Sequence, residues 1–283
     1  MSHDFSELKA AVGRSSPVAV ETAAAAPIAR LAATFGINVP AKAPGDVLPV
    51  GWHGMYFGAL HRPDNMRPDG QAISSSWMPA VPLAHHRIGR DHTSFPGDIR
   101  IGDELSRKTT IVDVNVAGSA DRPVLHIIQR SELSGPRGLA VVEERESVYF
   151  DGDRPAPGPA PTLPAPVWQK TFAPDHVLMF RYSALRFNSH RIHYDRDYAM
   201  KEEGMPGLAV QASLTAHLSL EMCRTALPQR RIASYTPVNR HQIYDTGPFS
   251  ICGAPAADGR SAMMWALDAQ GSVAQAGEIL FRD

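Results

Sequence analysis

The segment from residue 182 to 195 holds the densest group of side chains that can perform acid–base chemistry. Asn188, His190 and His193 follow one another within six residues, and Arg191 and Asp195 lie beside them. Histidine titrates near neutral pH and can therefore remove or donate a proton. Asn188 can hold a water by hydrogen bonds, five residues before His193. This spacing favours acid–base catalysis with His193 as the base, although a polar surface loop would have the same composition.

Two other kinds of chemistry find less support in the sequence. His190 and His193 are three residues apart near Asp195, but no CxxC or HExxH pattern supplies further metal ligands. We therefore expect no metal site. Cys223 falls in an apolar stretch typical of a core, and no GxSxG motif is present. Phosphate-binding glycine motifs are also missing, so we expect no nucleotide cofactor.

The elements that must position these residues fall into two halves. Residues 151–166 contain six prolines, a density that favours an extended spacer between units 1–150 and 167–283. In the second half, residues 208–227 contain no glycine or proline and are apolar on nearly every side, which predicts a buried helix after the Pro206-Gly207 turn.

A helix is also expected over 176–185, after Pro174, and a shorter apolar helix over 52–60. Each half then ends in two β-prone segments joined by a glycine-containing turn, over 125–150 and over 263–281. The chain is therefore predicted to be α+β, with two copies of a buried helix wrapped by an antiparallel sheet.

Composition limits the functional class. The 283 residues carry a formal charge of −1, without the basic excess that a nucleic-acid-binding protein needs. Two cysteines cannot build a disulfide framework, and no apolar run approaches the ~20 residues of a membrane span. We expect a cytoplasmic protein that binds neither nucleic acid nor membrane.

Residues 180–195 resemble the hydratase loop of the MaoC-like enoyl-thioester hydratases, within the branch of mesaconyl-C4-CoA and itaconyl-CoA hydratases and type 2 3-hydroxyacyl-thioester dehydratases. The resemblance extends to residues 52–57, 77–83, 101–104 and 138–144 of the first half. It implies a double hot-dog fold, a catalytic C-terminal lobe (167–283) and a non-catalytic N-terminal lobe (1–150). It also implies a homodimer or a higher homo-oligomer.

The resemblance also implies roles for individual residues. The family motif Asp-x-Asn-Pro-x-His places its base at His193, its Asp at Asn188 and its Asn at His190. Gln211-Ala212 replaces the family's His-Gly pair, so the Ala212 N–H is expected to bind the thioester oxygen. Further candidates for substrate binding are Arg191, Arg87, Tyr182, Gly207, Leu208, Trp77 and Met78.

Some of these candidates have alternative interpretations. Trp77 and Met78 can line an acyl pocket or belong to the core. The basic run from His85 to Arg87 can bind CoA phosphates or a substrate carboxylate, or form an exposed loop, and Tyr182 can simply pack.

The expected reaction is the reversible hydration of a short α,β-unsaturated acyl-CoA, with mesaconyl-C4-CoA or itaconyl-CoA, which give citramalyl-CoA, as leading substrates. Coenzyme A enters only as part of the substrate, and no cofactor is expected. Two alternatives are a hot-dog acyl-CoA thioesterase and a non-catalytic acyl-thioester-binding protein.

Overall fold

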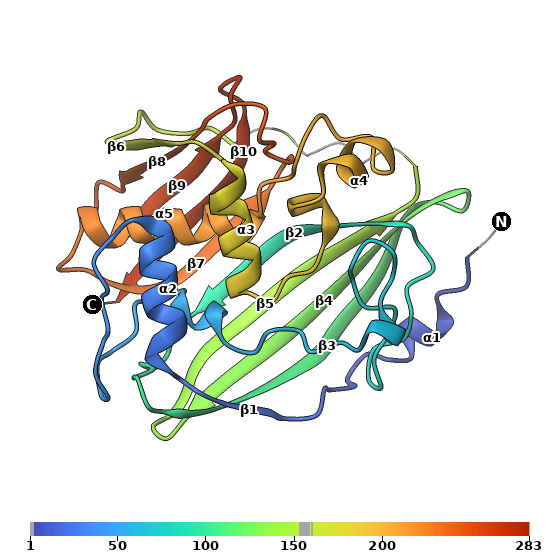
Figure 1. The fold of residues 1–283 in the computed structure, drawn as a ribbon, viewed down its shortest axis with the longest axis horizontal. Coiled ribbons are helices and arrows are strands. Elements are labelled where there is room, and N and C mark those ends of the chain that lie inside the picture. Colours follow the sequence, from blue (N-terminus) through green and yellow to red (C-terminus); the bar gives the residue numbers. More distant parts are fainter. Residues whose placement is uncertain (1–2, 153–158, 160, 283) are drawn as a thin grey trace.

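The computed structural model describes residues 3–152, 159 and 161–282, and its backbone is dominated by one antiparallel sheet (Figure 1). The ten strands are ordered β1-β3-β4-β5-β2-β7-β10-β9-β8-β6. Their bounds are β1 Ala19–Thr22, β2 His85–Ser94, β3 Glu104–Ser119, β4 Arg122–Gly135, β5 Gly138–Phe150, β6 Trp168–Phe172, β7 Arg231–Asn239, β8 Phe249–Pro255, β9 Ser261–Leu267 and β10 Val273–Arg282. The helices are α1 Ser6–Lys9, α2 Ala25–Phe35, α3 His176–Leu185, α4 Arg196–Lys201 and α5 Ala212–Ala226, with 3₁₀ helices η1 Trp52–Met55, η2 Pro63–Asn65 and η3 Arg191–His193.

The sheet is continuous across two lobes. Strands β1 to β5 belong to the N-terminal lobe and β6 to β10 to the C-terminal lobe, and the pairing of β2 with β7 joins them. Strand β5 ends at Phe150 and β6 begins at Trp168, on either side of the proline-rich segment. Residues 153–158 and 160 of that segment lie outside the described residues.

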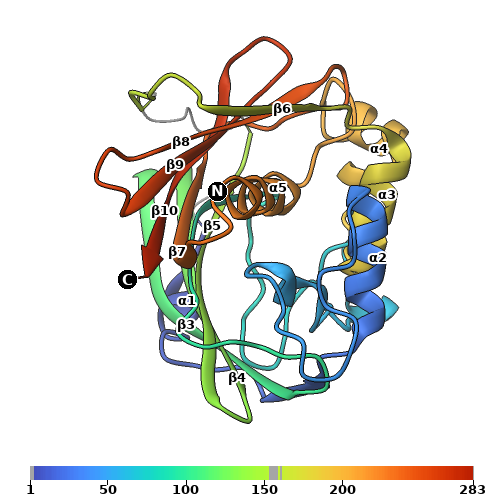
Figure 2. The same cartoon turned by 90° about the vertical axis from the view of Figure 1, so that its left-hand side faces the viewer.

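Helix α5 is the centre of the C-terminal lobe, and its position confirms the helix predicted over 208–227. Its buried side chains include Leu214, Leu218, Leu220 and Cys223, and it packs against β7, β8 and β9. Figure 2 shows it end-on, with the curved sheet around it. Burial of its apolar side chains supplies the main driving force for this arrangement.

The N-terminal lobe has no matching helix, so the expectation of a helix over 52–60 was wrong. Only the single turn of η1 forms there. Tyr56 is extended and Phe57 adopts a φ of 58°, which ends the helix. Gly51, at φ 85°, lies so close to α5 that a Cβ would be 2.6 Å from Leu220 Cδ1. The segment packs against α5 instead of forming a second central helix.

Without that helix, the inner face of the N-terminal sheet is polar. Arg107 and Thr109 on β3 and Glu143 and Arg145 on β5 alternate with outward-facing neighbours and point into a cavity. Strand periodicity of two places all of them on one face. This uncovered polar face forms one wall of the candidate site.

The largest hydrophobic core crosses from one lobe to the other. Helix α2 packs against α3, and one cluster of buried side chains includes Leu31 and Trp52 of the first half and Leu214 and Ile251 of the second. The Trp52 indole N–H donates to Glu221 Oε1 at 2.7 Å across the same boundary. Separating the halves would therefore expose apolar surface and the paired edges of β2 and β7.

We expect fragments 1–150 and 167–283 to be insoluble or unfolded when expressed separately, and to recover on co-expression. Solubility, gel filtration and circular dichroism would measure this. A 167–283 fragment that is soluble, unfolds cooperatively and is fully active would contradict the shared core.

Candidate active site

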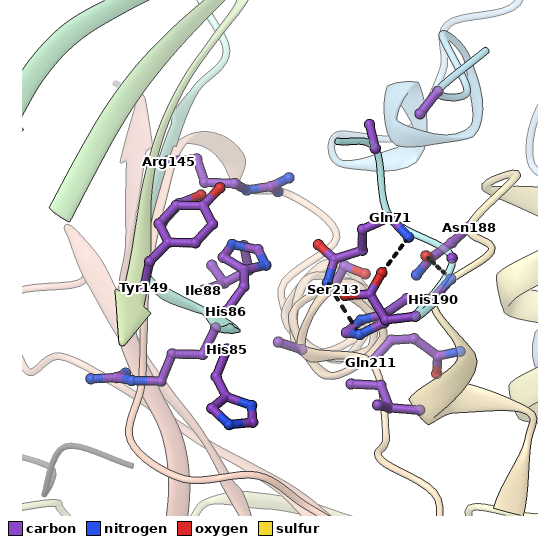
Figure 3. A pocket seen from close by; sticks show the side chains of 18 of the residues that line it. Gln71, His85, His86, Ile88, Arg145, Tyr149, Asn188, His190, Gln211 and Ser213 are labelled. Atoms are coloured by element: carbon purple, nitrogen blue, oxygen red, sulfur yellow. Dashed lines mark hydrogen bonds between the residues drawn. The ribbon is translucent and has the colours of Figure 1, made fainter. Parts of the chain in front are cut away.

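A cavity of about 1330 Å³ lies between the two lobes. Its walls are the inner face of β3 to β5, the start of β2, the first turn of α5, and the loops around residues 67–84 and 186–193. In Figure 3, His85, His86, Arg145 and Tyr149 lie on one side, and Gln71, Asn188, His190 and Gln211 face them from the other. The site is thus built from both halves of the chain.

His193 lies on η3 at the wall of this cavity and is 9% exposed. Its Nδ1 is 2.7 Å from the carbonyl oxygen of Ala209, which can only accept. Nδ1 therefore carries the proton, and Nε2 is left as a free base. Burial, aided by the neighbouring His190, lowers the pKa of His193 to about 3, while the bond to Ala209 opposes the shift. At neutral pH the imidazole is an uncharged base of fixed tautomer.

His190 is held beside His193 by a residue of the other lobe. Their rings meet edge-to-face with centroids 5.5 Å apart. The Gln71 amide donates from Nε2 to His190 Nε2 at 3.1 Å and also lies 3.4 Å from Asp69 Oδ2. Burial lowers the pKa of His190 to about 4, so this ring is also neutral at pH 7.

Asn188 completes the cluster predicted from the sequence. Its Oδ1 accepts from the backbone N–H of His190 at 3.1 Å, which leaves the Nδ2 amino group as a donor at the cavity wall. The structure therefore brings Asn188, His190 and His193 together around one cavity, in an arrangement that can orient and deprotonate a water.

The first turn of α5 faces the same space. Gln211 is its N-cap residue but makes no side-chain cap, because its Nε2 donates to Met179 O at 3.0 Å and Ser183 Oγ at 2.7 Å. The N–H groups of a first helical turn have no acceptor within the helix, and the helix dipole makes this end positive. The N–H of Ala212 is consequently placed to stabilise a developing negative charge.

The remaining sequence-predicted residues divide into two groups. Trp77, Met78 and Arg87 line the cavity, and Trp77 and Met78 also pack against the core of the N-terminal lobe. Gly207, Leu208, Tyr182 and Arg191 are not among the described residues that line it.

Hydrogen bonding explains the position of Tyr182. It is fully buried, and its hydroxyl donates to His217 Nδ1 at 2.7 Å, while His217 Nε2 donates to Gly51 O at 2.6 Å. The hydroxyl thus joins α3, α5 and η1 rather than facing a substrate.

Arg191 points away from the cavity. Its guanidinium donates to Asp195 Oδ2 from Nε at 3.0 Å and from Nη2 at 2.8 Å, and it lies 4.1 Å from the centroid of the Tyr198 ring. This placement does not support Arg191 as a partner for a substrate carboxylate. Leu208 is likewise buried, with its N–H donating to Asp245 Oδ1 at 2.8 Å.

Sequence reasoning did not identify several cavity residues: Gln71, Arg107, Glu143, Arg145 and Arg186. The available signal was the alternation within 105–109 and 141–149, where polar residues stand at positions that share a face with buried leucine and valine. Polar residues at these positions indicate a sheet face against which no apolar helix packs.

Comparison with known proteins defines the class. The family model of hydroxyacyl-thioester dehydratase type 2 matches residues 51–244, more than half of the chain. The chain is 31% identical over 233 residues to a mesaconyl-C(4)-CoA hydratase of Chloroflexus aurantiacus, covering 81% of this chain and 83% of that relative. It is 24% identical over 235 residues to the mitochondrial hydroxyacyl-thioester dehydratase type 2 of Schizosaccharomyces pombe, covering 72% and 78%.

Solved structures agree on the fold. A MaoC-like dehydratase superimposes with a TM-score of 0.73 at 14% identity, covering 97% of this chain and 99% of that one. A Mycobacterium tuberculosis protein described as a double hotdog fold has a TM-score of 0.54 at 13% identity, covering 96% of each chain. These matches confirm the double hot-dog fold.

The chain belongs to the hydroxyacyl-thioester dehydratase type 2 family and is a hydro-lyase of the hydratase/dehydratase kind. Among the described residues, none of the helices combines the length and the apolar character needed to cross a bilayer.

The buried histidines predict that the protein loses stability in acid. Burial lowers the pKa of His193 and His217 to about 3 and that of His86 and His190 to about 4. Below about pH 6.5 the unfolded chain binds protons at these positions and the folded chain does not. The free energy of unfolding should therefore fall as the pH decreases from about 6.5 towards 4, by up to ~1.4 kcal/mol per pH unit for each histidine.

Urea denaturation at several pH values from 7.5 to 5 would measure this slope, in a range where most carboxylates stay ionised. The variant His190→Gln, which lacks one of these buried imidazoles, should show a smaller slope. A stability that is constant from pH 7 to pH 5.5 would contradict the prediction.

Proposed function

We propose that this chain catalyses the reversible hydration of a short α,β-unsaturated acyl-CoA, with His193 as the acid–base residue. The observation that carries the proposal is the fixed tautomer of His193, whose unprotonated Nε2 is left free at the cavity wall that Asn188 and the first turn of α5 share. Family membership supports hydration over the thioesterase and non-catalytic alternatives.

The reaction requires three things of the site. His193 Nε2 takes a proton from a water that Asn188 orients, and the water oxygen forms a bond with Cβ of the thioester. The electron pair of the double bond moves towards the thioester oxygen, where the Ala212 N–H stabilises the charge. His193 then returns a proton to Cα, and the reverse sequence dehydrates the 3-hydroxyacyl thioester.

For the acyl group, we propose a C4 dicarboxyl thioester such as mesaconyl-C4-CoA. The support is the name and 31% identity of the Chloroflexus relative, together with a cavity wall that carries the charged strand residues Arg107, Glu143 and Arg145.

The cellular location and the oligomeric state of the chain remain predictions. We propose that the chain acts in the cytoplasm as a homodimer or a higher homo-oligomer, and that it uses no cofactor besides the CoA of its substrate. Analytical ultracentrifugation would test the assembly.

Replacing the base should abolish most of the activity without unfolding the protein. We expect His193→Ala to lower kcat by about 10²–10⁴, the usual contribution of a general base. The assay follows the loss of enoyl-thioester ultraviolet absorbance, and a thiol reagent reports any hydrolysis. His126→Ala, the matched substitution outside the cavity, should retain the parent rate; a His193→Ala rate within a few-fold of the parent would reject the assignment.

Activity should not depend on a metal ion. His190 and His193 have no convincing further ligands, and the part of the chain that the structure describes holds no group of three potential metal ligands. Dialysis against a strong chelator should therefore leave turnover unchanged. Elemental analysis provides the check, and stoichiometric zinc whose removal abolishes activity would overturn this expectation.

A further inference from the structure

Two arginines from different lobes line the cavity. Arg107 projects from β3, and Arg186 follows the last residue of α3. Arg107 lies over the Phe57 ring at 5.1 Å, and Arg186 lies over the Tyr182 ring at 5.9 Å. Neither guanidinium forms an ion pair with a carboxylate of the described residues.

The carboxylates around this arginine pair already have other partners. Glu143 accepts from His53 Nε2 at 3.1 Å, and Asp91 accepts from Arg145 Nε at 2.8 Å. Glu21 accepts from the backbone N–H of Phe57. The carboxylates near Arg107 and Arg186 therefore accept hydrogen bonds from other donors.

Arg107 is a partly buried cation in the protein alone. Burial lowers the pKa of Arg107, and the positive charges of Arg145 and Arg186 add to the effect, against the opposing charges of Glu143 and Glu21. Holding a desolvated cation without a paired anion costs free energy. A ligand anion bound between the two guanidiniums would remove that cost.

The position of Arg186 relates the pair to the reacting atoms. Arg186 is two residues before Asn188, and it lies with Ser213 of the first α5 turn near the Tyr182 hydroxyl, where both oppose the rise in the pKa of Tyr182. A Cβ at Gly54 would be 2.6 Å from Arg186 Nη1, so the glycine leaves room for this side chain. Arg186 is therefore near the place where the thioester oxygen and Cβ would lie, and Arg107 lines the same cavity.

We propose that Arg107 and Arg186 bind a free carboxylate on the acyl group and so select dicarboxyl CoA thioesters. This inference rests on the proposed function and extends it to the residues that set specificity. In a butenedioyl group attached to CoA through C4, the free carboxylate is a substituent of the carbon that receives the hydroxyl. The cation that binds this carboxylate must accordingly lie near the base, and Arg186 lines the same cavity as His193. Arginine suits this role because its planar guanidinium pairs with both carboxylate oxygens.

Binding of two saturated thioesters tests the proposal without turnover. Succinyl-CoA ends in a carboxylate where butyryl-CoA ends in a methyl group. Isothermal titration calorimetry gives the Kd of each thioester. We expect the parent to bind succinyl-CoA more tightly by at least ~30-fold, the lower range for a buried charged pair. Arg107→Gln and Arg186→Gln should each reduce that ratio to within about threefold, mainly by weakening succinyl-CoA.

Arg130→Gln is the matched control, because Arg130 pairs with Glu144 on the neighbouring strand and does not line the cavity. It should keep the parent ratio. Thermal unfolding of each variant identifies any loss of folding, and the parent ratio decides the proposal even where a variant is unstable.

Three outcomes would overturn the proposal. In the first, the parent binds butyryl-CoA as tightly as succinyl-CoA. In the second, the preference for succinyl-CoA survives both substitutions. In the third, the substitutions weaken the binding of both thioesters equally, which would assign the arginines to the CoA phosphates. Failure of the proposed function is distinguishable, since it would appear as absent hydration of any enoyl-CoA while the succinyl-CoA preference persists.

Discussion

Burial of α5 against one continuous sheet is the interaction on which the other features depend. The sheet passes from β5 through β2 and β7 into the C-terminal lobe, and it curves around the helix (Figure 2). Because the helix is locked by Leu214 and Leu218, its first turn has a fixed place at the cavity. His217 on α5 links the helix to its neighbours, because its imidazole accepts a hydrogen bond from the Tyr182 hydroxyl and donates one to the Gly51 carbonyl oxygen. These hydrogen bonds hold α3, α5 and η1 together around the cavity.

The two lobes have diverged around that frame. The C-terminal lobe keeps a central helix, whereas the N-terminal lobe has η1 and loops in its place. A sheet face without a covering helix has no reason to be apolar, and here it carries arginines and a glutamate. In the described residues, η1 and loops in place of a second central helix leave the cavity open and its wall polar, while the C-terminal lobe supplies the proposed acid–base residue, His193.

Desolvation connects the stability of the site with its chemistry. Burial keeps His190 and His193 uncharged at neutral pH, which leaves His193 ready to accept a proton. The same burial makes any charge within the cavity costly unless it is paired. A substrate carboxylate and the Arg107–Arg186 pair would therefore stabilise each other, and a neutral acyl group would leave both guanidiniums unpaired.

Local sequence patterns by themselves determined the helices over 176–185 and 208–227 and the strand over 138–150, because periodicity and the turns around each element are encoded locally. They also identified Asn188, His190 and His193, which lie within six residues of one another and need no long-range folding to meet. Only the tertiary structure decided which arginine faces the cavity. Arg191 is two residues before His193, yet its contacts with Asp195 and Tyr198 hold it outside the cavity. Arg107 and Arg186 come from different lobes, and both line the cavity. The direction of a side chain in a loop depends on partners distant in sequence. For the same reason the helix expected over 52–60 does not form. Its apolar residues are buried by contacts with α2 and α5, which no local pattern contains.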